Sequence, residues 1–104
     1  YFLRKLRDTP EGAGTLLDSC SILCTTEHPD GYTHTQDDFP ILVAGHGNGR
    51  LRGGVHYRYS GADSGSYRNT SDAVLTALRG AGVVAASFGS DAGYTTTSIS
   101  ELEV

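Results

Sequence analysis

The stretch from residue 26 to 39, TEHPDGYTHTQDDF, holds the densest group of side chains that could do chemistry. Glu27, His28, His34 and the pair Asp37–Asp38 supply carboxylates and imidazoles. Such groups bind zinc and other divalent cations, and they also serve as acids and bases. The spacing E-H-x5-H-x2-D-D matches no specific metal-binding motif. The same residues suit a solvated loop whose Asp and His side chains satisfy backbone turns, so both interpretations stay open.

A second candidate is the glycine-rich stretch 45–54, GHGNGRLRGG, which carries Arg50 and Arg52. Loops of this kind can bind phosphate through their backbone amides. The stretch lacks the Lys-Ser/Thr pair of a P-loop, and no helix is predicted to follow it directly. The sequence therefore favours a turn here. The sequence as a whole contains no G-x-S-x-G motif of the kind that holds a nucleophilic serine.

Cys20 and Cys24 are the two cysteines of the chain. In a strand, positions four apart share a face but lie roughly 13 Å apart, too far for a disulfide. A structural zinc site would need further ligands. We therefore predict two packed thiols.

Short helices and one longer helix are expected to position these groups. Residues 1–7 read as the end of an amphipathic helix, and 15–18 as a turn or short helical segment. The clearest pattern predicts a helix over 71–81, with Asn69 or Thr70 as its cap, an apolar stripe, and Gly82 just after its end. That stripe consists of Val74, Leu75, Leu78 and Ala81.

Three further segments are predicted to be strands. Residues 19–25 and 41–45 read as buried strands, the second apolar on both faces as in a parallel sheet. Residues 55–59, VHYRY, alternate and predict a short edge strand. The order of helices and strands is typical of an α/β fold. A small free-standing α+β domain is the alternative.

Composition limits the possible functions. The 104 residues are 38% hydrophobic with 14 glycines, which predicts a thin core that needs more chain or another copy to cover it. The net charge of −4, without basic runs, argues against nucleic-acid binding. No apolar run approaches the roughly 18–20 residues that span a membrane.

Several short motifs follow one another along nearly the whole chain. In this order they resemble the C-terminal part of a bacterial family known as domain of unknown function 1552, among the relatives of alkaline phosphatases and sulfatases. The matching positions are Leu16–Leu17–Asp18, Thr26–Glu27, His34, Phe39 to Gly45, Gly53 to Tyr59, Asn69 to Val83, and Phe88–Gly89.

The resemblance implies a three-layer sandwich of helices around a mostly parallel sheet, with residues 1–104 forming its C-terminal portion as one unit. It implies metal ligands at Glu27 and His34, with Asp38 as a supporting residue, for zinc, calcium or magnesium. The implied activity is metal-dependent hydrolysis of phosphate or sulfate esters by a longer, exported protein of the cell envelope or exterior. The alternative is a non-catalytic extracellular protein that serves a structural role or self-associates. In either case the expected partners are the rest of a longer chain or copies of the same chain.

Overall fold

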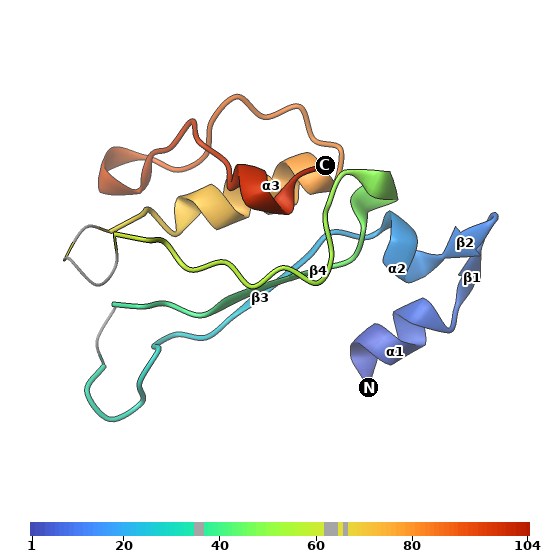
Figure 1. The fold of residues 1–104 in the computed structure, drawn as a ribbon, viewed down its shortest axis with the longest axis horizontal. Coiled ribbons are helices and arrows are strands. Elements are labelled where there is room, and N and C mark those ends of the chain that lie inside the picture. The colour runs from blue at the N-terminus through green and yellow to red at the C-terminus, as the bar shows by residue number, and fades with distance from the viewer. Residues whose placement is uncertain (35–36, 62–64, 66) are drawn as a thin grey trace.

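A computed structural model describes residues 1–34, 37–61, 65 and 67–104 of the protein (Figure 1). The fold is a mixed α/β arrangement of short helices and two-stranded antiparallel sheets. Residues 35–36 of the predicted 26–39 loop lie outside the described residues. The mixture of helices and strands agrees with the fold class predicted from the sequence, whereas the antiparallel strand directions differ from the predicted parallel sheet.

The N-terminal part begins with helix α1 (Phe2–Arg7), as predicted. A small hairpin of β1 (Pro10–Glu11) and β2 (Gly14–Thr15) follows, and it leads into helix α2 (Leu16–Ser19). The carboxylate of Asp18 accepts hydrogen bonds from both the backbone N–H and the hydroxyl of Thr15, each at 2.8 Å. The Thr15 side chain in turn accepts a hydrogen bond from the backbone N–H of Asp18, and this reciprocal capping box explains why so short a helix begins at Leu16. The Thr15 hydroxyl is also the main reason that the pKa of Asp18 lies below its usual value.

The central sheet consists of β3 (Ile22–Thr25) and β4 (Ile41–Ala44). The two strands are antiparallel, with Ile22 opposite Ala44, so the prediction of a parallel sheet is wrong for this pair. Parallel strands need a long crossover, usually a helix, whereas here a loop returns the chain directly beside β3. Burial on both faces is wrong too, because the side chain of Leu42 is 53% exposed. The sandwich expected from the resemblance is therefore not seen in the described residues.

The segment 55–59 does not form a strand, although its alternation predicted one. It runs beside β4 without forming strand pairs with the described residues, and the turn at 45–51 joins the two (Figure 1). That turn is the one predicted from the glycines, and it contains a short 3-10 helix at Gly47–Gly49.

Helix α3 (Ser71–Gly80) confirms the clearest prediction from the sequence. Thr70 is the N-cap residue and makes no side-chain cap hydrogen bond with the described residues, but the side-chain oxygen of Asn69 accepts a hydrogen bond from the N–H of Ser71 at 3.0 Å. At the other end the N–H of Gly82 binds the carbonyl of Arg79, and the next N–H, that of Val83, binds the carbonyl of Leu78. This pattern is a Schellman motif, and Gly82 supplies the positive φ of +85° that it requires.

The core is small and lies around α3. Among the described residues its buried apolar side chains are Leu51, Ala73, Leu75 and Ala77. The accessible surface is 7013 Å², about a quarter more than the roughly 5,600 Å² expected for a monomer of this mass. The radius of gyration, 14.8 Å, also exceeds the roughly 13 Å of a compact chain of this length. The thin core predicted from composition is confirmed. None of the described helices is long and apolar enough to span a bilayer.

Both cysteines are free. Cys20 is half-buried after α2, which agrees in part with the predicted packed thiol. Cys24 is exposed on β3, so the prediction is wrong there. Cys24 lies opposite Leu42 in the sheet, and the side chain of Leu42 is exposed as well.

Candidate functional site

The residues predicted to bind metal lie around the connection between β3 and β4. Glu27 is exposed, and His34 is exposed with its ring stacked on His28 at 4.5 Å between centroids. Asp38 is exposed and bound to Arg58. Among the described residues, no three His, Cys, Asp or Glu side chains are grouped to hold a metal ion. The metal site at Glu27, His34 and Asp38 therefore stays a prediction.

The described part of the loop contains a side-chain turn of the kind that its composition allows. The carboxylate of Asp30 accepts hydrogen bonds from the Thr33 hydroxyl at 2.6 Å and from the Tyr32 N–H at 3.0 Å. These bonds hold the pKa of Asp30 below its usual value, with the Thr33 hydroxyl as the main cause. This geometry supports the solvated-loop interpretation for residues 30–33.

Asp38 links the two chain segments on either side of a groove. Its carboxylate accepts two hydrogen bonds from the Arg58 guanidinium, at 2.8 and 3.2 Å. The hydrogen bond from Arg58 holds the pKa of Asp38 below its usual value, against a smaller opposing effect of burial. Because Asp38 precedes β4 and Arg58 belongs to the facing segment, the pair fixes one end of the groove.

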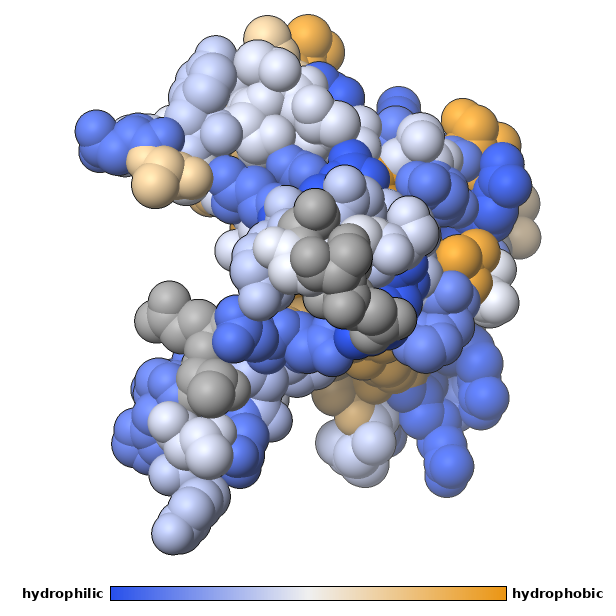
Figure 2. Space-filling model, turned by 60° about the vertical axis from the view of Figure 1, so that its left-hand side comes forward, coloured by the Kyte–Doolittle hydropathy of each residue, from blue (hydrophilic) through white to orange (hydrophobic). Residues whose placement is uncertain are grey.

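The groove itself lies between β4 and the segment 52–59. Its volume is about 590 Å³, and α3 and the C-terminal residues also contribute to its walls. Figure 2 shows a notched, largely hydrophilic surface on which hydrophobic side chains emerge in separate places. The apolar and aromatic residues lining the groove include Ile41, Leu42, Val43, Val55, Tyr57 and Ile99.

The backbone edge of β4 that faces away from β3 has no strand partner. Among the described residues, β4 makes strand pairs with β3 and with no other segment. No backbone hydrogen bond joins β4 to 55–59 in this part of the chain either. In an antiparallel strand about half of the N–H and C=O groups point to each edge. The groove therefore presents apolar side chains together with unpaired backbone groups of β4.

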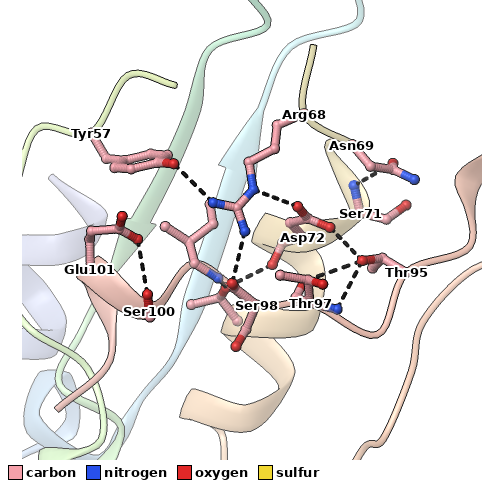
Figure 3. Close-up of polar contacts among 12 residues, drawn as sticks. Tyr57, Arg68, Asn69, Ser71, Asp72, Thr95, Thr97, Ser98, Ser100 and Glu101 are labelled. Carbon is pink, nitrogen blue, oxygen red and sulfur yellow. Dashed lines mark hydrogen bonds and ion pairs between the residues drawn. The ribbon is translucent and has the colours of Figure 1, made fainter. Parts of the chain in front are cut away.

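A polar network behind the groove holds its walls in place (Figure 3). The guanidinium of Arg68 donates to the carboxylate of Asp72 at 2.8 Å, to the Tyr57 hydroxyl at 2.9 Å and to the Ser98 carbonyl at 3.0 Å. Burial acts to lower the pKa of Arg68, but the hydrogen bonds to Asp72 and Tyr57 outweigh it, so this pKa is raised. One side chain thus ties together α3, the 52–59 segment and the C-terminal segment.

The same network continues into α3 through buried polar groups. Asp72 also accepts a hydrogen bond from the Thr95 hydroxyl at 2.5 Å. The Thr76 hydroxyl, fully buried, donates to the Asp72 carbonyl and accepts from the N–H of Ile99. The buried face of α3 therefore includes two polar residues, whereas Ala81 of the predicted stripe is exposed.

Sequence reasoning missed Arg68 and Tyr57. The four-residue spacing from Arg68 to Asp72, which forms an ion pair along the chain, was the available signal. Nothing in the local sequence indicates the other two partners of Arg68, Tyr57 and Ser98, because they lie 11 and 30 residues away. Comparison of the chain with protein-family models, with curated proteins and with solved structures found no match.

Proposed function

We propose that this chain is a non-catalytic docking unit, whose groove beside β4 binds an extended segment of polypeptide as an additional strand. The observation that carries the proposal is that one edge of β4 has no strand partner among the described residues and borders a groove of about 590 Å³ lined by apolar and charged residues. This takes up the non-catalytic alternative suggested by the sequence. The segment comes from a second copy or from another part of a longer chain.

Strand addition suits this groove better than a compact ligand does. An added strand pairs its main chain with an exposed sheet edge, while alternate side chains enter pockets beside that edge. β4 offers four residues of edge, about 13 Å in length. A two-stranded sheet is also marginally stable by itself, so a third strand stabilises it.

The surface area of the chain supports the same conclusion. It exceeds the expectation for a compact monomer by about 1,400 Å², compared with about 800 Å² that each partner buries in a standard interface. Large apolar side chains such as Leu42 and Tyr67, 53% and 67% exposed, line the groove. The groove alone is smaller than a standard interface, which predicts weak binding of short peptides.

The test is a titration with the capped peptide acetyl-Thr-Val-Trp-Val-Thr-amide, followed by its fluorescence because the chain contains no Trp. Amide hydrogen exchange of the protein is measured alongside. We expect saturable binding and slower exchange at β4. A peptide with Pro in place of both Val residues is the control, because Pro has no N–H to donate to the edge.

Matched variants locate the binding surface. Leu42→Glu places a charge in the groove, whereas Val84→Glu places one at a fully exposed position that does not line it. We expect the first to abolish peptide binding and the second to leave it unchanged. Equal affinities of the two variants, or unaltered exchange at β4, would refute the proposal. Sedimentation equilibrium then shows whether a second copy supplies the strand.

A further inference from the structure

We infer that the groove selects an extended segment carrying a basic residue at one end and an acidic residue at the other, an inference that rests on the proposed function. The charges along the groove are the basis. Arg58 binds Asp38 and Arg68 binds Asp72, so these two cations are already matched. Asp37 and Arg52 also line the groove and are exposed, and neither makes an ion pair with any described residue.

Asp37 and Arg52 lie at opposite ends of β4. Asp37 comes four residues before the strand begins at Ile41. Arg52 follows the turn after the strand, and its neighbour Gly53 lies against the His46 ring at the other end. The strand between the two charges is about 13 Å long, which exceeds the screening length of about 8 Å at physiological salt. Each charge therefore acts separately on its own end of a bound strand.

This arrangement favours a particular chemistry in the partner. A strand lying along β4 places one end near Asp37 and the other near Arg52. A basic residue at the first end and an acidic residue at the second then each face an opposite charge. A strand with two acidic or two basic ends leaves a like charge facing one of them. Because both protein residues are exposed, each match is expected to raise affinity by no more than about fivefold.

The experiment compares four capped peptides with the core Thr-Val-Trp-Val-Thr and the ends Lys…Glu, Glu…Lys, Lys…Lys and Glu…Glu. We expect one of the two mixed peptides to bind about threefold to tenfold more tightly than both uniform ones, in 50 mM salt. The mixed peptide that binds more tightly also reports whether the added strand runs parallel or antiparallel to β4. Raising the salt to 0.5 M is expected to remove most of the difference.

Two variants assign the preference to its residues. In Arg52→Gln the Lys…Lys peptide is expected to bind with the same affinity as the tighter mixed peptide, because its second Lys no longer faces a like charge. In Asp37→Asn the Glu…Glu peptide is expected to do so for the corresponding reason. Equal binding of all four peptides, with β4 still protected by the neutral peptide, overturns the charge rule and leaves the docking function standing. Failure of every peptide to protect β4 removes the docking function itself. The salt dependence of the unmodified protein tests the rule even if a variant does not fold.

Discussion

Replacing Arg68 by Met tests whether the network behind the groove holds its walls together. The substitution keeps a side chain of similar length but removes the guanidinium. Three hydrogen bonds are lost, to the Asp72 carboxylate, the Tyr57 hydroxyl and the Ser98 carbonyl. Asp72 keeps the hydrogen bond from Thr95 but loses its countercharge.

The size of the effect follows from the burial of the two partners. The Asp72 side chain is 6% exposed, and removing one partner of a buried ion pair costs about 3–5 kcal/mol. The Arg68 side chain is 26% exposed, so water reaches the site and the cost is smaller. We expect the free energy of unfolding to fall by about 2–3 kcal/mol, which is less than the cost of breaking a fully buried pair because water can replace part of what the three hydrogen bonds supply. This corresponds to a melting temperature lower by about 10–20 °C.

Urea denaturation followed by far-UV circular dichroism measures the change. Arg52→Met is the matched control, since Arg52 is exposed and its side chain makes no hydrogen bond to the described residues. We expect its free energy of unfolding to stay within about 0.5 kcal/mol of the unmodified protein. If Arg68→Met behaves like this control, the network does not hold the walls.

A double-mutant cycle with Asp72→Asn isolates the ion pair. Asn at this position removes the buried charge, so the loss of Arg68 is expected to cost at least about 1 kcal/mol less in that background. Equal costs in both backgrounds would contradict the assignment of the effect to the Arg68–Asp72 contact. Hydrogen exchange at 52–59 should rise in Arg68→Met, because the Tyr57 hydroxyl no longer accepts a hydrogen bond from residue 68.

The remaining predictions concern the core, pH and metal. Gly80→Ala is expected to destabilise the fold by about 1–3 kcal/mol, because a Cβ there would lie 2.6 Å from the buried Leu51 side chain; Gly31→Ala, with open space around it, serves as the control in the same urea assay. Asp18, Asp30 and Asp38 have lowered pKa values in the folded chain, so they contribute stability above their unfolded pKa of about 3.9, and this stability is lost as the pH falls through their folded pKa values. The urea midpoint should therefore stay constant between about pH 5 and 7 and decrease below about pH 4. A constant midpoint down to about pH 2 would contradict this. If the predicted metal ligands act together, calorimetric titration with zinc chloride gives saturable heat that His34→Ala removes, and a flat titration of the unmodified chain counts against the metal site.

Local sequence was enough to predict α1, α2 and α3 and the approximate positions of β3 and β4, but not the small β1–β2 hairpin. The pattern of α3, with Asn69 before it and Gly82 after it, contains its own start and stop signals, and each of these signals acts within a few residues. The Thr15–Asp18 capping box is equally local. Such features depend on backbone groups of the same segment, so they survive in the tertiary structure.

Strand direction and strand pairing could not be predicted in this way. An apolar run such as residues 41–45 suits a buried parallel strand and an edge-exposed antiparallel strand equally well. Segment 55–59 alternates apolar and polar residues as a strand does, but it makes no backbone hydrogen bonds with β4 in the described part of the chain. Pairing depends on which other segment lies beside a strand, and that is a property of the whole chain.

The candidate site shows the same division. From the sequence, the loop at 26–39 held the densest group of carboxylates and imidazoles, and the resemblance implied metal ligands at Glu27 and His34 with Asp38 in support. That site stays a prediction. In the structure Asp38 binds Arg58 at the end of a groove. That groove lies between segments far apart in the chain, and Arg68 ties 52–59 and the C-terminal residues to α3 beside it. Residue types and their spacing determined which groups are available, whereas tertiary packing decided which of them meet, since contacts between residues far apart in the chain leave no local pattern.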